Sequence, residues 1–192
     1  MELKDKKIIL ASGSPRRKEI LEGMDLCFET DTRNSFKEEF GPDIPHEEIP
    51  ALMSRGKSHG FHRELGENEI LVTADTMVLC RGQVLGKPKD REDAIRMLKL
   101  ISGHLHRVIT AVTIRDREHE TTFSDTSYVH FRELENSEIE YYVDRYRPYD
   151  KAGAYAIQEW IGYTGIIKID GSYYNIMGLP AHRLYEELMK FI

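Results

Sequence analysis

The sequence has few cysteines and lacks any long hydrophobic run. No apolar stretch approaches the roughly 20 residues that a membrane-spanning helix needs, so no membrane partner is expected. The first residues also lack the apolar core and the small-residue cleavage site of a secretory signal. The two cysteines, Cys27 and Cys80, match no metal-binding or redox spacing, which predicts two reduced, buried thiols. Together these absences predict a cytoplasmic protein.

An excess of positive charge is also missing. The formal net charge is -6 and the sequence pI is about 5.8, whereas a protein that binds nucleic-acid backbones usually presents a basic surface. We therefore expect no nucleic-acid partner, although a local cluster of Lys and Arg could still hold one small anion. At 192 residues, with 40% hydrophobic and 31% charged side chains, the chain is typical of a globular protein with one large domain or two small lobes.

Apolar periodicity predicts an α/β protein with a mixed sheet, because strands and helices do not simply alternate. Strands are expected at the short apolar runs, which are residues 8–11, 70–74, 108–114, 121–131 and 166–169. Helices are expected where apolar residues recur at helical spacing, at residues 15–23, 49–65, 91–101, 137–144 and 180–191. In the second helix, Leu52, Met53 and Phe61 are expected to face inward. Ser137 and Glu140 are spaced as a capping box for the fourth helix.

The segment Leu10-Ala-Ser-Gly-Ser-Pro-Arg-Arg17 joins the first expected strand to the first expected helix. A turn of small residues exposes backbone N–H groups, and the N-terminus of the helix adds positive potential. The hydroxyl of Ser12 and the guanidinium groups of Arg16 and Arg17 add donors that suit a phosphate. The alternative is an ordinary strand–helix turn with two exposed arginines, since the segment is not a Walker-type loop.

Asp75 directly follows the buried strand that is expected at residues 70–74. A carboxylate at the carboxyl end of a strand in an α/β crevice suits a Mg²⁺ ligand or a general base. For Asp75 taken alone, a helix cap or a turn-forming Asp is an equally good interpretation.

Two further segments could contact a nucleotide. Gly86 and Pro88 hold Lys87 in an extended loop from which its ammonium group could reach a phosphate, although exposed loop lysines are usually only solvated. Small residues precede Gln158, whose amide has both a donor and an acceptor and could bind the edge of a base or serve a structural role. The glycine-bounded segment 171–180 is expected to be structural.

Five separated parts of the sequence together resemble the Maf family of nucleoside triphosphate pyrophosphatases, over nearly the whole chain. They are Leu10-Ala-Ser-Gly-Ser-Pro-Arg-Arg17, Ala74-Asp-Thr76, Leu85-Gly-Lys-Pro88, Asp150-Lys-Ala-Gly-Ala-Tyr155, and Gly171-Ser-Tyr-Tyr-Asn175 with Gly178-Leu-Pro180. The resemblance implies one domain over residues 1–192, with a fold like that of the inosine-triphosphate pyrophosphatases, in which two lobes flank a cleft around a mixed sheet. It also implies a homodimer.

The resemblance also implies which residues form the site. Those expected to act in catalysis are Asp75, Lys57, Lys87 and Glu38. Of these, Asp75 and Glu38 are also the expected ligands of Mg²⁺ or Mn²⁺. Those expected to bind the substrate are Ser12, Arg17, Arg16, Thr76 and Gln158, the last three by contacting the pyrimidine. The sequence departs from the family pattern around residues 36–40, where Glu39 could take the place of Glu38. It departs again at Ala156-Ile-Gln-Glu159, where Gly-Ile-Gln-Gly is commoner, and this could alter the base pocket.

The function that the resemblance implies is hydrolysis of dTTP and UTP to the monophosphate and pyrophosphate. Metal-assisted water would attack the α-phosphorus, with positioning and charge stabilisation supplying most of the acceleration. Asp75 would act as the base or hold the metal, while Arg17, Lys57 and Lys87 would neutralise the triphosphate. Two alternatives stay open: a preference for other triphosphates, and a nucleotide-binding regulator of cell division with little or no turnover.

Overall fold

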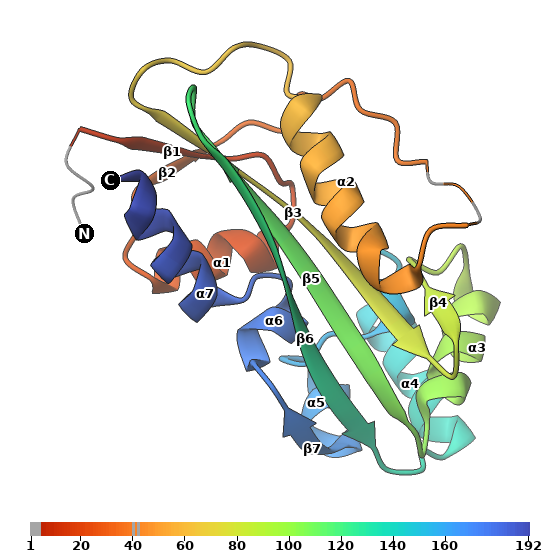
Figure 1. Cartoon of the computed structure of the whole chain (residues 1–192). Helices are drawn as coiled ribbons and strands as arrows, with labels where there is room; N and C mark the ends of the chain where they lie inside the picture. The colour runs from red at the N-terminus through yellow and green to blue at the C-terminus, as the bar shows by residue number, and fades with distance from the viewer. Residues whose placement is uncertain (1–4, 40, 42) are drawn as a thin grey trace. The chain divides into compact units, whose positions relative to one another are not determined.

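The computed structural model describes residues 5–39, 41 and 43–192, which form a mixed α/β fold (Figure 1). The strands are β1 (Lys7–Leu10), β2 (Phe28–Thr30), β3 (Glu69–Cys80), β4 (Gln83–Leu85), β5 (Leu105–Arg115), β6 (Glu120–Phe131) and β7 (Ile166–Asp170). The α-helices are α1 (Pro15–Gly23), α2 (Ile49–His59), α3 (Arg91–Ile101), α4 (Asn136–Tyr146), α5 (Trp160–Gly165), α6 (Tyr173–Met177) and α7 (Ala181–Leu188). Short 3₁₀ helices are η1 (His46–Glu48), η2 (Ala152–Ala154) and η3 (Met189–Phe191). The predicted α/β class is confirmed.

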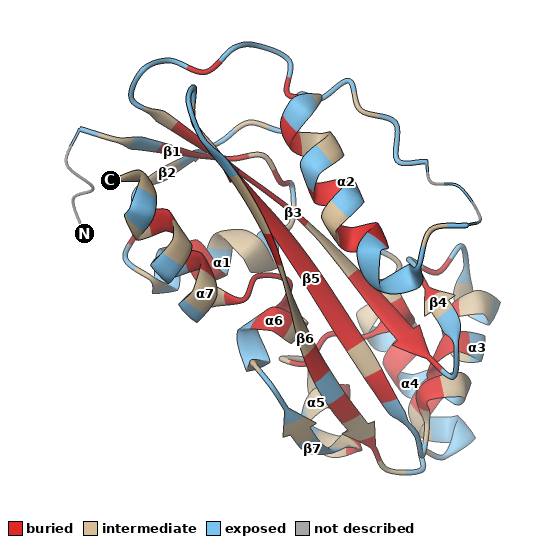
Figure 2. Ribbon diagram, in the orientation of Figure 1, coloured by how far each residue is buried: buried red, intermediate tan, exposed pale blue. Residues whose placement is uncertain are grey.

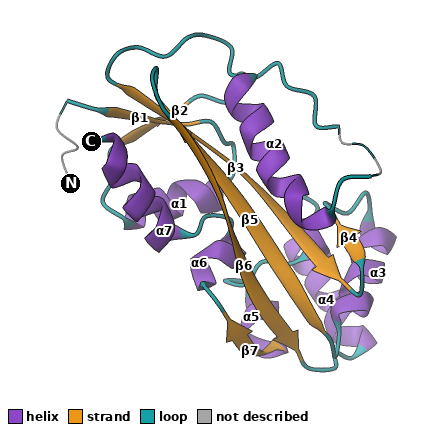
Figure 3. Cartoon of the chain, in the orientation of Figure 1, coloured by secondary structure: helices purple, strands orange, loops and turns teal. Residues whose placement is uncertain are grey.

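The strands form a seven-stranded mixed sheet in the order β2-β1-β3-β5-β6-β7, with β4 paired to β3 (Figure 3). β1 runs parallel to both of its neighbours, so that Ile8 lies opposite Phe28 of β2 and Ile70 of β3. β4 and β7 run antiparallel to β3 and β6. The three apolar residues of β1 are buried, which is the pattern of an inner parallel strand covered on both faces.

The chain divides into two compact units. The first unit comprises Met1–Asp75, Thr110–Asp125 and Gly178–Ile192, and the second comprises Thr76–Ile109 and Thr126–Met177. The boundary within β3 therefore falls directly after Asp75. That residues 1–192 act as one domain with these units as its lobes stays a prediction.

Each unit has an apolar core of its own, in which the buried positions of the strands are prominent (Figure 2). In the first unit Ile9 of β1 and Leu71 of β3 pack with Phe61. In the second unit α3 lies against α4 and buries Leu98 and Ile101 completely. Within the described part of the chain, every helix is too short or too polar to cross a membrane.

The strand that carries Asp75 is longer than expected. β3 continues through Asp75 to Cys80, so the prediction that Asp75 ends a strand is wrong. The mostly apolar run from Thr76 onward favours a longer strand. The turn comes at Arg81 and Gly82, whose φ values of 51° and 77° suit the tight turn into β4. A carboxylate is tolerated inside β3 because it pairs with an ammonium group.

Helix α2 is shorter than expected and ends at His59. The prediction that Leu52 faces inward is wrong, since this residue is 39% exposed, whereas Met53 is buried as expected. Phe61 is also buried, but it lies beyond the helix, where it pairs with Asn34 in an isolated β-bridge. The helix stops because the chain turns to make this pairing, which lies 27 residues away in sequence and has no local signal.

The capping box of α4 is shifted from the expected position. Glu135 and Glu138 form it, rather than Ser137 and Glu140, because the helix begins at Asn136. Glu135 accepts the N–H of Glu138, and the Glu138 side chain accepts the N–H of Glu135. The capping box therefore lies two residues earlier than expected. A glutamate carboxylate takes the place of the expected serine hydroxyl at the N-cap.

The two cysteines differ in their environments. Cys80 is buried as expected, and burial raises the pKa of its thiol, but Cys27 is exposed, so the prediction of two buried thiols is wrong for Cys27. Helices α5 and α6 were not expected either. They span six and five residues, which is too short for helical periodicity to be visible in sequence.

His106 is a buried titratable group in the second unit. It is 1% exposed and contacts the rings of Phe131 and Tyr155. Its Nε2 lies 2.8 Å from the hydroxyl oxygen of Tyr155. Burial lowers the pKa of the imidazole to about 3.

Because this folded-state pKa lies below the ordinary value of 6.5, His106 contributes stability that is fully present above pH 6.5 and is lost as the pH falls toward 3. The loss is about 1.4 kcal/mol per pH unit in that window. Between pH 6.5 and 5 the wild-type chain should therefore lose about 2 kcal/mol more unfolding free energy than a His106→Gln variant. Urea unfolding at both pH values measures this difference, and equal losses in the two chains would contradict it.

Candidate active site

The turn between β1 and α1 has the arrangement of an anion-binding site. The N–H of Ala11 donates to the Val72 carbonyl at 2.9 Å and so continues the parallel pairing of β1. Ser12 Oγ then accepts the N–H of Ser14 at 3.3 Å, and Pro15 takes the first position of α1. The side chain of Ser14, the residue that caps α1, makes no capping hydrogen bond to the first turn of the helix. A helix N-terminus that follows a small-residue turn suits a phosphate.

Arg17 connects three parts of the first unit. Its Nη1 donates to Ser12 Oγ at 3.1 Å and to the Ala74 carbonyl at 2.9 Å, and its Nε donates to the Gly178 carbonyl at 3.0 Å. Burial lowers the pKa of the guanidinium to about 10, an effect that the charge of Asp75 partly offsets. Arg17 is therefore still a cation at neutral pH, and it places a positive charge against the turn at Ser12.

Lys57, in the last turn of α2, joins two carboxylates. Its Nζ lies 2.6 Å from Asp75 Oδ1 and 3.0 Å from Glu38 Oε1. The side chains of Lys57 and Asp75 are 20% and 19% exposed, whereas that of Glu38 is 62% exposed. Lys57 and Asp75 thus form a partly desolvated pair, which Glu38 reaches from the surface. Of the two acidic residues considered for this loop, the structure places Glu38 rather than Glu39 against Lys57.

Buried hydroxyl groups set the register of α2 on β3. Ser54 Oγ donates to Thr113 Oγ1 at 2.9 Å, and Thr73 Oγ1 donates to the Ser54 carbonyl at 2.8 Å. All three residues are fully buried. Lys57 follows Ser54 by three residues on a helix, and Asp75 follows Thr73 by two residues on a strand, so each pair shares one face. The contact of Ser54 with Thr73 therefore aligns Lys57 with Asp75.

Ser54→Ala is expected to lower the free energy of unfolding by about 1–2 kcal/mol, because it leaves buried polar groups without their partner. It should also weaken the Lys57–Asp75 alignment and so reduce any turnover that depends on it. Urea unfolding measures the first effect. Ser35→Ala is the matched control, since the Ser35 hydroxyl bonds the Gly60 carbonyl at an exposed site. Equal stability of both variants would contradict the proposed register contact.

The loop before Glu38 is held against the end of α2. Asn34 Nδ2 donates to the Lys57 carbonyl at 2.6 Å. The ring of Phe36 lies so close to Gly56 that a side chain at Gly56 would overlap it. These contacts bring the chain that carries Glu38 to the helix end where Lys57 lies. No spacing in the sequence predicts this approach.

In the second unit, the loop with Lys87 lies beside the segment that leads to Gln158. The N–H of Gly153 donates to the Gly86 carbonyl at 3.1 Å, next to Lys87. Gly153 has a φ of 72°, and a Cβ there would meet the Val78 side chain at 3.0 Å, so this junction favours glycine. Lys87 itself is exposed, and its ammonium group is accessible to a ligand.

The predicted site residues thus fall into two groups. Those in the first unit are Ser12, Arg16, Arg17, Glu38, Lys57 and Asp75. Those in the second unit are Thr76, Lys87 and Gln158. The structure brings Ser12 into contact with Arg17, and Lys57 into contact with Asp75 and Glu38. Their participation in a reaction stays a prediction.

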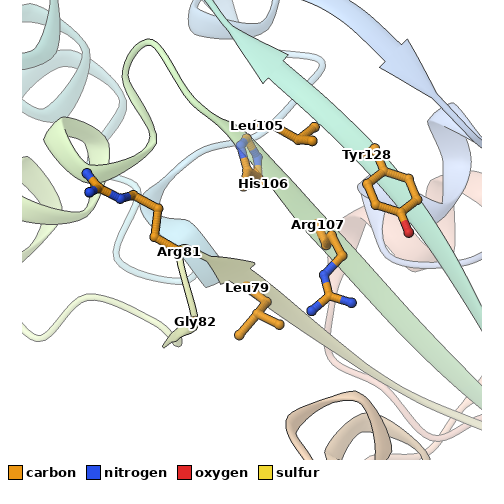
Figure 4. Close-up of a pocket in the computed structure, with 7 residues that line it drawn as sticks. All are labelled: Leu79, Arg81, Gly82, Leu105, His106, Arg107 and Tyr128. Atoms are coloured by element: carbon orange, nitrogen blue, oxygen red, sulfur yellow. The ribbon is translucent and has the colours of Figure 1, made fainter.

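A cavity of about 320 Å³ in the second unit lies elsewhere (Figure 4). Its rim includes the side chains of Arg81, Arg107 and Tyr128. Among the described residues that line it there is no carboxylate and none of the predicted site residues.

The fold and these contacts define an α/β protein in which the Ser12 turn, backed by Arg17, and a carboxylate–ammonium cluster occur in one compact unit. Residues 7–191 match the family described as Maf-like protein, and the chain belongs to this family.

Similar proteins support the same assignment over almost the full length. The chain is 47% identical to a dTTP/UTP pyrophosphatase of Porphyromonas gingivalis, over 98% of this chain and 96% of that protein. It is 47% identical to a dTTP/UTP pyrophosphatase of Parabacteroides distasonis, over 98% of each chain. A dTTP/UTP pyrophosphatase of Bacteroides fragilis is 46% identical over 95% of this chain and 94% of its own. The predicted family resemblance is confirmed.

Proposed function

We propose that the chain hydrolyses nucleoside triphosphates to the monophosphate and pyrophosphate, with dTTP and UTP as its preferred substrates. The observation that carries this proposal is the contact of Lys57 with Asp75 in the same unit as the turn backed by Arg17. Hydrolysis of a triphosphate needs a carboxylate that can act on water and fixed cations that can balance phosphate charge, and this unit has both. The names of the similar proteins support the same substrates.

In the proposed reaction, a water oxygen bonds to the α-phosphorus while the bond from that phosphorus to the bridging oxygen breaks, and pyrophosphate leaves. Asp75 either accepts the proton of the water or would hold a divalent cation. Lys57 keeps the Asp75 carboxylate in place through the 2.6 Å contact. Ser12 orients the phosphates, and Arg17, Lys57 and Lys87 balance their charge.

The donor set suits a divalent cation that binds together with its substrate. The carboxylates of Asp75 and Glu38 converge on a single cationic nitrogen, that of Lys57. Mg²⁺ commonly takes one or two carboxylates together with phosphate oxygens. Among the described residues there is no group of three or more His, Cys, Asp or Glu side chains that could hold a metal by themselves. We propose that Asp75 and Glu38 hold Mg²⁺ or Mn²⁺, which when bound supplies Lewis-acid activation and charge neutralisation.

A panel of triphosphates tests the proposed function. Purified protein with Mg²⁺ should release pyrophosphate, and not orthophosphate, from UTP and dTTP faster than from other triphosphates. Release of orthophosphate, or a preference for a purine triphosphate, would contradict the proposal. Tight binding of UTP without any turnover would instead favour a nucleotide-binding regulator of cell division.

Gln158→Ala should mainly reduce discrimination among bases. Loss of one hydrogen bond to an uncharged base edge costs on the order of 1 kcal/mol, which is a several-fold change in the ratio of kcat/KM values. The measurement is kcat/KM for UTP, dTTP and two purine triphosphates in both chains. An unchanged preference would remove Gln158 from base recognition.

The family resemblance also leads us to propose a homodimer in the cytoplasm, with residues 1–192 acting as one domain. Light scattering on the purified chain measures the mass in solution. A single species of about 22 kDa, the mass of one chain, would contradict the dimer.

A further inference from the structure

Gln158 lies in a tight turn, residues 156–159, that is fastened at both ends. The N–H of Glu159 donates to the Ala156 carbonyl at 3.1 Å and closes the turn around Ile157 and Gln158. The hydroxyl of Tyr142, on α4, accepts the N–H of Ala156 at 3.1 Å and donates to the carboxylate of Glu159. A single hydroxyl group therefore bridges the two residues that bound the turn.

The surroundings of Tyr142 keep this bridge in place. Tyr142 is fully buried, and its ring stacks on that of Tyr146 with 4.9 Å between centroids. Burial raises the pKa of the Tyr142 phenol, so that the hydroxyl remains a donor at neutral pH. Lys151, itself 8% exposed, places its Nζ 3.4 Å from Glu159 Oε1 and supplies a counter-charge for the carboxylate.

The first turn of α5 holds the same turn from another side. The N–H of Gly162 donates to the Glu159 carbonyl at 2.9 Å. A Cβ at Gly162 would collide with the carbonyl of Ile157, so the helix backbone lies directly against the turn. Residues 156–159 therefore have little room to move relative to α4 and α5.

The side chain that this turn presents has an unsatisfied acceptor. Gln158 Oε1 is buried and has no hydrogen-bond partner among the described residues. A buried acceptor without a partner is costly, and a ligand with an N–H group can remove that cost. The carboxamide also carries donors, so it can pair with a base edge on which a donor and an acceptor lie side by side.

We propose that Tyr142 and Glu159 are positioning residues, which hold the Gln158 carboxamide for a base with an imide N–H and so favour uracil and thymine over cytosine. This inference rests on the proposed function. Uracil and thymine carry N3–H between two carbonyl groups, whereas cytosine has an unprotonated N3 at that place. A site built around a fixed acceptor rejects an analogue that lacks the donor, because the acceptor stays unpaired. Loosening the turn lets the carboxamide move and reduces that penalty.

The test compares UTP with CTP in four chains: wild type, Tyr142→Phe, Gln158→Ala and the double variant. Tyr142→Phe should raise KM for UTP and reduce the UTP/CTP ratio of kcat/KM by up to about fivefold, the change expected for Gln158→Ala, with kcat for UTP within about twofold of wild type. The UTP/CTP ratio of kcat/KM in the double variant should be no lower than in Gln158→Ala alone, because both changes remove the same interaction. A residue with a merely structural role would lower kcat/KM for both nucleotides equally, and its effect would multiply with that of Gln158→Ala.

Two further comparisons separate positioning from general packing. Tyr141→Phe is the matched control, because Tyr141 is 49% exposed on the same helix and contacts Trp160 through its ring. It should leave the UTP/CTP ratio unchanged. Glu159→Gln keeps an oxygen that can accept from Tyr142 and should retain most of the preference, whereas Glu159→Ala should lose it. The Glu159 pair also keeps the test decisive if Tyr142→Phe fails to fold.

An unchanged UTP/CTP ratio in Tyr142→Phe or in Glu159→Ala overturns the proposal, and so do losses that multiply in the double variant. Calorimetric binding of UTP and CTP to the same variants separates this outcome from failure of the proposed function. If the wild-type chain releases no pyrophosphate, the hydrolase proposal fails. In that case the positioning proposal is tested by binding alone: Tyr142→Phe should reduce the ratio of UTP affinity to CTP affinity by up to about fivefold, and an unchanged ratio overturns it.

Discussion

Asp75→Asn is expected to lower kcat for UTP by about 10²–10⁴-fold while the chain stays folded. Asparagine keeps an oxygen that can accept from Lys57 Nζ, which lies 2.6 Å from Asp75 Oδ1 in the wild-type chain. It can neither take a proton from water nor offer a charged oxygen to a metal. Local geometry is therefore preserved while the proposed chemistry is removed. Pyrophosphate release at saturating UTP and Mg²⁺ measures the loss, and thermal unfolding of the same sample checks the fold.

Asp116→Asn is the matched control for this experiment. Asp116 lies in the hairpin between β5 and β6, where its Oδ1 accepts the N–H groups of Glu118 and His119 at 2.8 and 2.7 Å. Asparagine can keep both bonds, so turnover should stay near wild type. Near-normal turnover in Asp75→Asn would remove Asp75 from the catalytic role. Loss of UTP binding together with turnover would make Asp75 a binding residue.

Lys57→Met should produce the next largest loss, a decrease in kcat for UTP of about 10²–10³-fold with an increase in KM. The substitution removes a cation that contacts both Asp75 and Glu38, and with it a charge that would balance the departing pyrophosphate. Methionine has a similar length and a good helix propensity, so α2 should remain intact. Initial rates over a range of UTP concentrations separate the effects on kcat and KM.

Arg55→Met controls for loss of a positive charge on the same helix. Arg55 is 53% exposed and lies 3.9 Å from Glu120, away from Asp75. Its replacement should change kcat by less than about twofold, since exposed pairs of this kind contribute little. Equal effects of the two substitutions would show that only the overall charge of α2 matters. Turnover that survives Lys57→Met would remove Lys57 from the catalytic group.

Several elements could be predicted because their signals are local. Helix α3 has the expected bounds: Asp90 caps it by accepting the N–H of Asp93 at 2.8 Å, and its apolar residues recur at helical spacing. Pro15 begins α1 and Gly23 ends it, as their backbone preferences indicate. In these elements the residues that start, stop and stabilise the helix all lie within or next to the helix itself.

Other features depend on contacts between distant residues. β3 passes through Asp75 without ending, because Lys57 from α2 pairs with the carboxylate that would otherwise break the strand. α2 ends early because Phe61 pairs with Asn34. The link between Tyr142 and Glu159 was not expected, since it spans 17 residues and belongs to no recognised motif. Glu159 was noted only as part of a departure from the family pattern. Lys57 follows Ser54 by three residues and Asp75 follows Thr73 by two, so each pair lies on one face of its helix or strand. These spacings could have indicated that Lys57 and Asp75 meet, but only once the contact between Ser54 and Thr73 was known.

The α/β class, the family and the residue types of the candidate site could be predicted without a structure, because motif order and apolar periodicity are properties of the chain. The folded chain was needed to show that Lys57 contacts Asp75 and that Glu38, rather than Glu39, contacts the same ammonium group. These contacts depend on the register of α2 on β3, which buried hydroxyl groups set, and on the path of the loop at Asn34. The register and the loop path both depend on contacts between residues that are far apart in sequence, and local conformational preferences do not determine such contacts.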